Sequence, residues 1–315
     1  MGATLRSMSR ILLLLGLAAS LLVGACGTTG GGAVSSGSAA PAPSGASASV
    51  IPVIVSSRQV PGPNRFVFSF LDPGTNEPAA SPDRAASVAF IAPGETQPGP
   101  ATEATFVWAI EGERGDYVAN VTFAAPGDYK AVFVTEAPGS PEEAVAVDFQ
   151  VAESSPTVGI GSAAPATDNP TIETAGSVER VSTDTDPVPT FYQVTVKEAL
   201  ASHTPFVLVF ATPAFCLSAQ CGPTLDRIKA VADTAPDDVA FINVEPYQLA
   251  FTEGRLQPVL DADNQLQPVE AVTEWGILTE PWVFTVDGTG IVRGSFEGVV
   301  GEDELTTAIE AISGS

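Results

Sequence analysis

Residues 205–223 read PFVLVFATPAFCLSAQCGP, and this stretch decides how the second half of the chain is interpreted. Its first part, 205–211, is a continuous apolar run, which is typical of a central strand buried on both faces of a sheet. Two of the three cysteines of the chain, Cys216 and Cys221, follow it closely. From Cys216 to about Ala235 the apolar side chains recur at helical spacing. The pattern predicts a buried strand that leads into a helix, with a cysteine pair near the junction.

Strands and helices also alternate through the rest of the C-terminal region, residues 191–315. The pattern predicts a strand followed by a helix in 190–203, a strand in 239–245, a hairpin formed by 282–287 and 291–298, and a closing helix in 301–312. The hairpin turn contains Asp287-Gly288-Thr289-Gly290, and the last helix has acidic residues in its first turn, where the helix dipole favours them. This order of elements indicates an α/β domain.

Three features of residues 191–315 resemble the thioredoxin fold. They are FVLVFATPAFC at 206–216, WGILTEPWVF at 275–284, and the terminal hairpin and helix. The resemblance implies a thioredoxin-like domain, a cis-proline at Pro281 that shapes a groove for a partner peptide, and a redox-active pair formed by Cys216 and Cys221. Glu280, just before this proline, is unusual as an acid. If Glu280 faces the sulfurs, its charge disfavours a thiolate; if it faces solvent, it has no effect.

The spacing of the cysteines departs from thioredoxin, because four residues separate them instead of two. On a continuous helix their Cα atoms would be about 8–9 Å apart, which exceeds the bridgeable range of about 7 Å. A disulfide therefore requires a break, for which Gly222-Pro223 is the candidate. We favour a helix that is capped by Thr212 and begins at Pro213, so that Cys216 lies in its first turns. The alternative is a helix that begins near Cys221, with Thr224 where thioredoxin has its second cysteine.

The region 50–152 contains seven strand-like runs separated by turns rich in proline and glycine, which predicts an antiparallel β-sandwich. Residues 115–134 resemble the closing strands of immunoglobulin-like modules, and Tyr129 is a candidate tyrosine-corner residue. The aromatic residues Trp108, Tyr117 and Phe123 either line a binding face or lie in the core, and we favour the core. With no cysteine, histidine or clustered carboxylates, this region is interpreted as a spacer or an interaction module.

The N-terminal segment has the pattern of an export signal, with Arg6 and Arg10 before an apolar stretch at 11–23. The sequence VGAC at 23–26 resembles the bacterial lipobox, which implies cleavage before Cys26 and a lipid on its sulfur. Residues 26–49 are rich in Gly, Ser, Ala and Pro and are predicted to be a flexible tether. Residues 153–190 are predicted to be a polar linker and lead-in. We therefore expect a lipid-anchored protein on the extracytoplasmic face of the cell membrane.

The composition indicates a chain of two domains and argues against binding to nucleic acid. About 290 residues remain after removal of 1–25, and 44% of the chain is hydrophobic. The net charge is −24, and loss of the two arginines of the signal segment makes it −26. Such an excess of acid opposes binding to nucleic acid and electrostatic docking on anionic lipid.

The function predicted from these features is an extracytoplasmic thiol–disulfide oxidoreductase, with Cys216, Cys221, Glu280 and Pro281 at its site. Its expected partners are exported protein thiols or disulfides and a membrane electron donor or acceptor, with the membrane contacted through the lipid on Cys26. No cofactor and no metal site is expected.

Three alternatives remain open. The first is a binding scaffold with a structural disulfide. The second is a peroxiredoxin-like peroxidase, which needs Thr or Ser three residues before Cys216, where Pro213 stands, and a supporting Arg227 or Arg293. The third is a copper carrier of the Sco type, for which the histidine ligand is missing, because the single histidine is His203 and both methionines lie in the signal segment.

Overall fold

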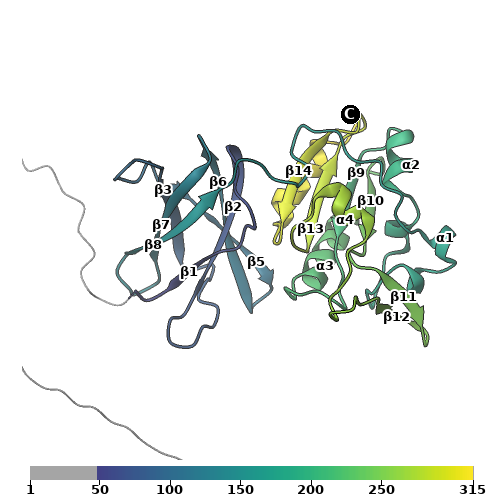
Figure 1. Cartoon of the computed structure of the whole chain (residues 1–315), viewed down its shortest axis with the longest axis horizontal. Coiled ribbons are helices and arrows are strands. Elements are labelled where there is room, and N and C mark those ends of the chain that lie inside the picture. The colour runs from purple at the N-terminus through teal and green to yellow at the C-terminus, as the bar shows by residue number, and fades with distance from the viewer. Residues whose placement is uncertain (1–47, 315) are drawn as a thin grey trace, which may run out of the picture. The chain divides into compact units, whose positions relative to one another are not determined.

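The computed structural model describes residues 48–314, within which the strands form four sheets accompanied by short helices (Figure 1). The predicted signal segment, Cys26 and nearly all of the predicted tether lie outside the described residues. Among the residues that are described, no helix has the length and apolar character needed to cross a membrane.

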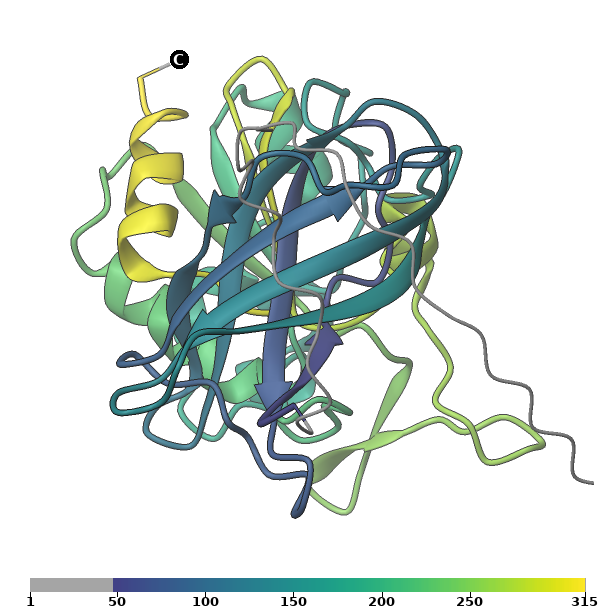
Figure 2. The same ribbon diagram turned by 90° about the vertical axis from the view of Figure 1, so that its left-hand side faces the viewer.

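Two four-stranded antiparallel sheets form the first part of the described chain (Figure 2). One has the order β1 (Ile51–Ile54), β2 (Gly62–Leu71), β6 (Arg114–Phe123), β5 (Thr105–Ile110); the other has the order β4 (Thr102–Glu103), β3 (Ala85–Ile91), β7 (Gly127–Glu136), β8 (Glu143–Val151). All seven strands predicted for this region are confirmed, and the two-residue β4 is additional.

Side-chain alternation directs one face of each of these sheets into a shared core. Phe66, Phe68 and Phe70 of β2 are fully buried, and the ring centroid of Phe68 lies 4.8 Å from that of Phe133 on β7. The apolar contacts between the two sheets therefore come from residues two positions apart, as the sequence pattern indicates.

The aromatic residues singled out in this region are mainly core residues. Tyr117 and Phe123 are buried, whereas Trp108 is half-buried and packs edge-to-face on Phe106. Tyr129 is buried as well, and its hydroxyl donates a hydrogen bond to the carbonyl of Ala125 at 3.0 Å. The predicted turn-capping role of Tyr129 is thus confirmed.

Tyr129→Phe is expected to lower the free energy of unfolding by about 1 kcal/mol, the usual net contribution of a neutral hydrogen bond. The ring stays in place, so the loss isolates the hydroxyl. Urea unfolding followed by tryptophan fluorescence measures the change. An unchanged midpoint would show that the hydroxyl does not stabilise this turn.

The third sheet has the order β10 (Ala240–Val244), β9 (Phe206–Phe210), β13 (Trp282–Val286), β14 (Val292–Glu297). β9 and β10 are parallel, whereas β13 runs antiparallel to β9 and forms a hairpin with β14. Every residue of β9 is buried, so the predicted central strand is confirmed, as are the strand at 239–245 and the hairpin.

Helices cover both faces of this sheet. The packing of β9 shows this, since its alternate residues belong to two different clusters. Val207 and Val209 pack with apolar residues of α3 (Cys221–Ala232) and α5 (Glu302–Glu310). Phe206, Leu208 and Phe210 pack with residues of α2 (Val196–Ala201) and α4 (Glu270–Trp275). Burial on both faces explains why the strand is apolar throughout.

The strand predicted at the start of 190–203 is wrong. This stretch forms the 3₁₀ helix η2 (Pro189–Tyr192), and only the following helix, α2, matches the prediction. Phe191 stacks on Phe241, while the hydroxyl of Tyr192 lies 2.8 Å from that of Ser182. Both neighbouring aromatic side chains are buried in the same core cluster, which a strand with alternating faces does not allow.

Two further segments differ in detail from the sequence-based expectations. The 153–190 stretch contains α1 (Ile172–Ala175) and η1 (Val178–Arg180), and it packs on the third sheet through buried residues such as Val181. A small hairpin, β11 (Leu249–Thr252) and β12 (Arg255–Pro258), follows β10 and was not predicted.

Candidate functional site

The carboxyl ends of β9 and β10 and the amino end of β13 meet at one edge of the third sheet. Phe210, the last residue of β9, lies opposite Val244 of β10 and Trp282 of β13. The loop after β9, the loop after β10 and the segment before β13 therefore emerge side by side. The edge at which parallel strands end is the usual place for a site in open α/β sheets.

The cysteine pair lies in the loop after β9 and at the start of α3. A disulfide joins Cys216 to Cys221, and their Cα atoms are 5.9 Å apart. Cys221 is the first residue of α3 and is fully buried, whereas Cys216 lies in the preceding loop and is partly exposed. Cys216 is therefore the accessible member of the pair.

The favoured prediction of a helix that begins at Thr212-Pro213 is wrong, and the alternative start near Cys221 is confirmed. After one turn closed by a hydrogen bond from the Phe215 amide, the chain bends through Ala219, whose φ of 62° is left-handed. A right-handed helix does not run through such a residue. Gly222-Pro223 lies within the first turn of α3, where a missing N–H costs nothing, rather than at a break between the cysteines.

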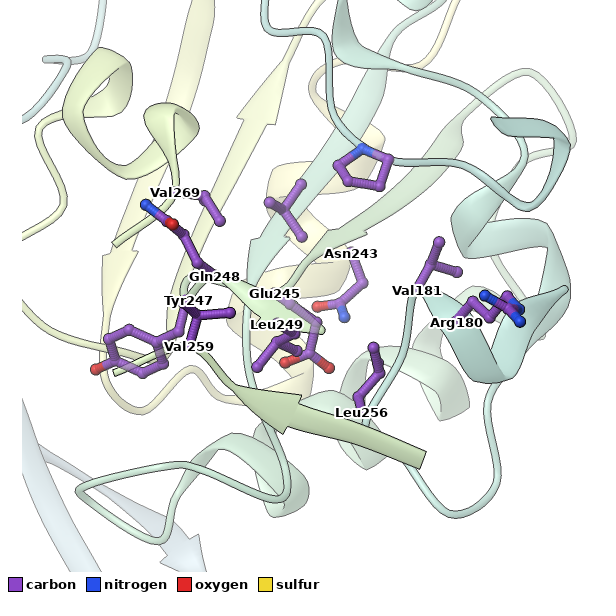
Figure 3. A pocket seen from close by; sticks show the side chains of 12 residues that line it. Arg180, Val181, Asn243, Glu245, Tyr247, Gln248, Leu249, Leu256, Val259 and Val269 are labelled. Atoms are coloured by element: carbon purple, nitrogen blue, oxygen red, sulfur yellow. The ribbon is translucent and has the colours of Figure 1, made fainter. Parts of the chain in front are cut away.

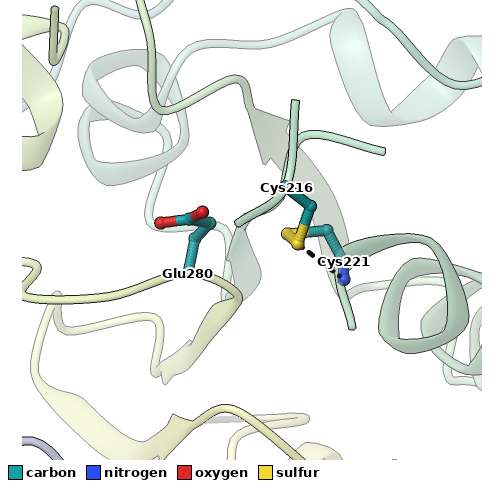
Figure 4. A group of neighbouring side chains, drawn as sticks. All are labelled: Cys216, Cys221 and Glu280. Carbon is teal, nitrogen blue, oxygen red and sulfur yellow. Dashed lines mark hydrogen bonds between the residues drawn. A yellow bond between two sulfur atoms is a disulfide. The ribbon is translucent and has the colours of Figure 1, made fainter. Parts of the chain in front are cut away.

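The sulfur of Cys216 lies at the amino end of α3 (Figure 4). It accepts a hydrogen bond from the backbone N–H of Cys221 at 3.2 Å, and the Ser218 hydroxyl lies 3.4 Å away. In the reduced protein the Cys221 N–H and the positive end of the helix dipole favour a thiolate at Cys216 over a thiol.

Glu280 faces the disulfide, so the first of its two predicted orientations is correct. The sulfurs of Cys216 and Cys221 and a carboxylate oxygen of Glu280 all lie within 4.8 Å of one another (Figure 4). One carboxylate oxygen accepts a hydrogen bond from the Leu217 amide at 3.0 Å, and the other accepts one from the Tyr247 hydroxyl at 2.8 Å. A negative charge in this place opposes thiolate formation.

The fourth predicted site residue, Pro281, is buried and follows a cis peptide bond from Glu280. The backbone carbonyl of Glu280 accepts a hydrogen bond from the Ser218 hydroxyl at 3.0 Å. The loop that carries Cys216 is therefore attached to the cis-proline segment through both the side chain and the backbone of Glu280.

Tyr247 and Ser218 belong to the site but were not predicted from the sequence. Burial and the neighbouring Glu280 raise the pKa of Tyr247 above its ordinary value, so its hydroxyl remains a donor at neutral pH. Tyr247 follows β10 by three residues, and the parallel pairing of β9 and β10 would have placed it at this edge. Ser218 carried no comparable signal in the sequence.

A cavity of about 360 Å³ lies next to the carboxyl end of β10 (Figure 3). Its lining includes Tyr247 together with the buried residues Asn243 and Glu245. The Glu245 carboxylate accepts a hydrogen bond from the Thr183 amide at 2.6 Å. Burial raises the pKa of Glu245 to about 7, although hydrogen bonds from Thr212 and Thr183 oppose this shift.

Glu245→Gln is expected to flatten the pH dependence of stability. The ordinary pKa of this group is 4.5, so between about pH 4.5 and 7 the native state binds more protons than the unfolded state. The free energy of unfolding therefore falls as pH rises through this window, with a slope from this group of up to about 1.4 kcal/mol per pH unit.

Urea unfolding of the wild type and of Glu245→Gln across this pH range measures the difference. Asp116, whose pKa burial raises to about 6, is present in both proteins and contributes equally to both profiles. Parallel profiles for the two proteins would mean that Glu245 does not hold its proton in the native state.

The residues required by the alternative functions have other contacts. Arg227 donates to the carbonyl of Val300 at 3.0 Å, and Arg293 pairs with Asp287. The ring of His203 contacts the carbonyl of Gly288 at 3.2 Å. These contacts give no support to a peroxidase or a copper site at the cysteine pair.

The comparisons with known proteins assign this chain to no family. The chain matches no protein-family model and no curated protein. Among solved structures, a DUF4426 family protein from Pseudomonas aeruginosa PAO1 is similar at 12% identity and a TM-score of 0.21, over 29% of this chain and 74% of that chain. A TM-score of this size does not establish a common fold.

Proposed function

We propose that this chain is a thiol–disulfide oxidoreductase built on a thioredoxin-like domain, and that Cys216 and Cys221 carry its chemistry. The observation that carries the proposal is the placement of an accessible sulfur, bonded to a buried one, at the amino end of α3 beside a cis-proline. The parallel β10–β9 pair, the antiparallel β13–β14 hairpin and the helices on both faces support the thioredoxin-like assignment.

The reaction follows from the different exposure of the two cysteines. The Cys216 thiolate attacks a partner disulfide, forms a mixed disulfide and displaces one partner thiolate. The Cys221 thiolate then attacks the Cys216 sulfur, which releases the second partner thiolate and restores the Cys216–Cys221 bond. The partner gains two electrons, and this protein loses two. The reverse sequence oxidises a partner dithiol.

The surroundings of the pair suit a polypeptide partner. Leu217, beside Cys216, is 79% exposed, and Leu278, two residues before Glu280, is 41% exposed. Both offer exposed apolar area on the two segments that carry Cys216 and Glu280. The proposed location is the extracytoplasmic face of the membrane, with a lipid on Cys26, exported proteins as partners, and a membrane protein as electron donor or acceptor. The first two sheets would serve as an immunoglobulin-like spacer or interaction module.

Reduction of oxidised glutathione by the dithiol form of the protein tests the proposal. Formation of reduced glutathione is expected for the wild type and is expected to disappear in Cys216→Ser, while Ser154→Ala, a change at an exposed loop residue, retains it. An inert dithiol form in the wild type would indicate a scaffold with a structural disulfide. Consumption of hydrogen peroxide without disulfide exchange would instead indicate a peroxidase.

A further inference from the structure

The charge of Glu280 opposes ionisation of the two thiols, so thiol–disulfide exchange by itself does not explain its position. Its carboxylate lies within 4.8 Å of both sulfurs, so in the reduced protein it would be next to two groups that ionise to anions. Three negative charges at this distance repel one another. The same three charges attract a divalent cation, and metal binding takes thiolates rather than thiols.

We propose that the reduced protein binds Zn²⁺ through the sulfurs of Cys216 and Cys221 and a carboxylate oxygen of Glu280. Zinc accepts thiolate and carboxylate ligands together, with Zn–S distances of about 2.3 Å and Zn–O distances of about 2.0–2.2 Å. Tetrahedral geometry with these bond lengths requires separations of about 3.5–3.8 Å between ligand atoms. Reduction breaks the bond between the sulfurs and lets them separate to this distance, and the carboxylate oxygen, now within 4.8 Å of them, reaches it by a small side-chain movement.

The hydrogen bonds of Glu280 match those of a metal-binding carboxylate. The Leu217 amide and the Tyr247 hydroxyl each donate one hydrogen bond to it, one to each oxygen. Each oxygen retains a second lone pair for a metal. Ligating carboxylates in proteins are commonly oriented by such outer partners, and loss of a partner weakens metal affinity about 10–100-fold.

The donor set selects zinc over copper(I). A carboxylate oxygen is a poor ligand for a soft cation. Within residues 48–314, the group of ligand atoms at the pair contains no further sulfur and no imidazole. Because Cys216 is partly exposed, the fourth position of a tetrahedral site would be open to water or to a partner thiolate.

Zinc binding and disulfide formation exclude each other, since both use the same two sulfurs. Binding Zn²⁺ releases the thiol protons and leaves the oxidation state of the sulfurs unchanged. Oxidation of the pair removes two electrons, which pass to a partner disulfide, and releases the ion. The bound ion is therefore expected to protect the dithiol from oxidation. This proposal requires a reducible pair but does not require catalytic exchange.

Titration of the reduced full chain with Zn²⁺ against a chromophoric chelator, without oxygen, tests the proposal. One ion per chain is expected to bind the reduced protein and none the disulfide form. Glu280→Gln and Tyr247→Phe are each expected to weaken binding about 10-fold or more. Glu310→Gln, an acid-to-amide change at an exposed position of α5, is expected to bind as the wild type does. Titration with Co²⁺ is expected to produce thiolate-to-metal charge-transfer absorption and the visible bands of a tetrahedral site.

Absence of stoichiometric Zn²⁺ binding by the reduced wild type would overturn the proposal, and so would equal affinities for wild type and Glu280→Gln. Circular dichroism and disulfide re-formation on oxidation show whether each variant is folded. Glutathione reduction, measured separately in the presence of a chelator, reports on exchange alone, so that failure of zinc binding and failure of the oxidoreductase function are distinguishable.

Discussion

In the reduced protein, iodoacetamide is expected to alkylate Cys216 rapidly and Cys221 slowly. Cys216 is partly exposed and receives the N–H at the start of α3, whereas Cys221 is fully buried. A thiol with the ordinary pKa of about 8.5 is only about 3% thiolate at neutral pH, so a pKa lowered by one unit raises the thiolate fraction by somewhat less than about tenfold. The N–H at the start of α3 and the greater exposure of Cys216 therefore act in the same direction.

Single-cysteine variants measure this asymmetry without interference from disulfide formation. Cys221→Ser, which retains Cys216, is expected to react at least about tenfold faster than Cys216→Ser, which retains Cys221. With a partner disulfide present, Cys221→Ser is expected to accumulate a mixed disulfide that mass spectrometry detects. Faster alkylation of Cys221 would reverse the assigned roles of the two sulfurs.

Gly276→Ala is expected to destabilise the protein by about 3 kcal/mol or more, from the left-handed conformation and from overpacking together. Gly276 caps α4 with φ of 63°, and a Cβ there would lie 2.0 Å from the carbonyl oxygen of Pro156. The adjoining segment contributes the hydrogen bond from the Thr157 hydroxyl to the Gly276 carbonyl at 2.8 Å. Because backbone atoms block the Cβ, a rotamer change cannot relieve the contact.

Gly254→Ala provides the matched control. Gly254 also has a positive φ, 80°, but a Cβ there would meet no atom within 4 Å. In Gly254→Ala the free energy of unfolding is expected to fall only by the conformational cost, about 1–2 kcal/mol. Urea unfolding of the two variants separates this cost from the backbone contact. Equal losses at the two positions would mean that the segment containing Pro156 moves away freely.

The strands of the first two sheets and the central strand β9 were predicted correctly from the pattern of apolar residues. β7 and β8 alternate between more buried and more exposed residues along their length, and β9 is apolar because both of its faces are covered. These features are local consequences of burial, so the sequence carries them directly. Tyr129 was also predictable, because its hydrogen bond joins residues only four positions apart.

The start of α3 was not predictable from local signals. Thr212-Pro213 is a good helix start, yet the helix begins at Cys221, because the intervening loop is bound to a distant segment. The Leu217 amide and the Ser218 hydroxyl donate to Glu280, more than sixty positions away in sequence. Such tertiary hydrogen bonds override a local preference, and their donors give no periodic signal. Glu280 itself was found only because it precedes the proline of a recognisable segment.

The reduction potential of the Cys216–Cys221 pair tests the central proposal most directly. Equilibration with glutathione redox buffers, followed by quantification of the thiols, measures it. An exchanging pair is expected to lie between about −120 and −270 mV, the range of known disulfide oxidoreductases. A potential below about −300 mV, typical of structural disulfides, would contradict the assignment.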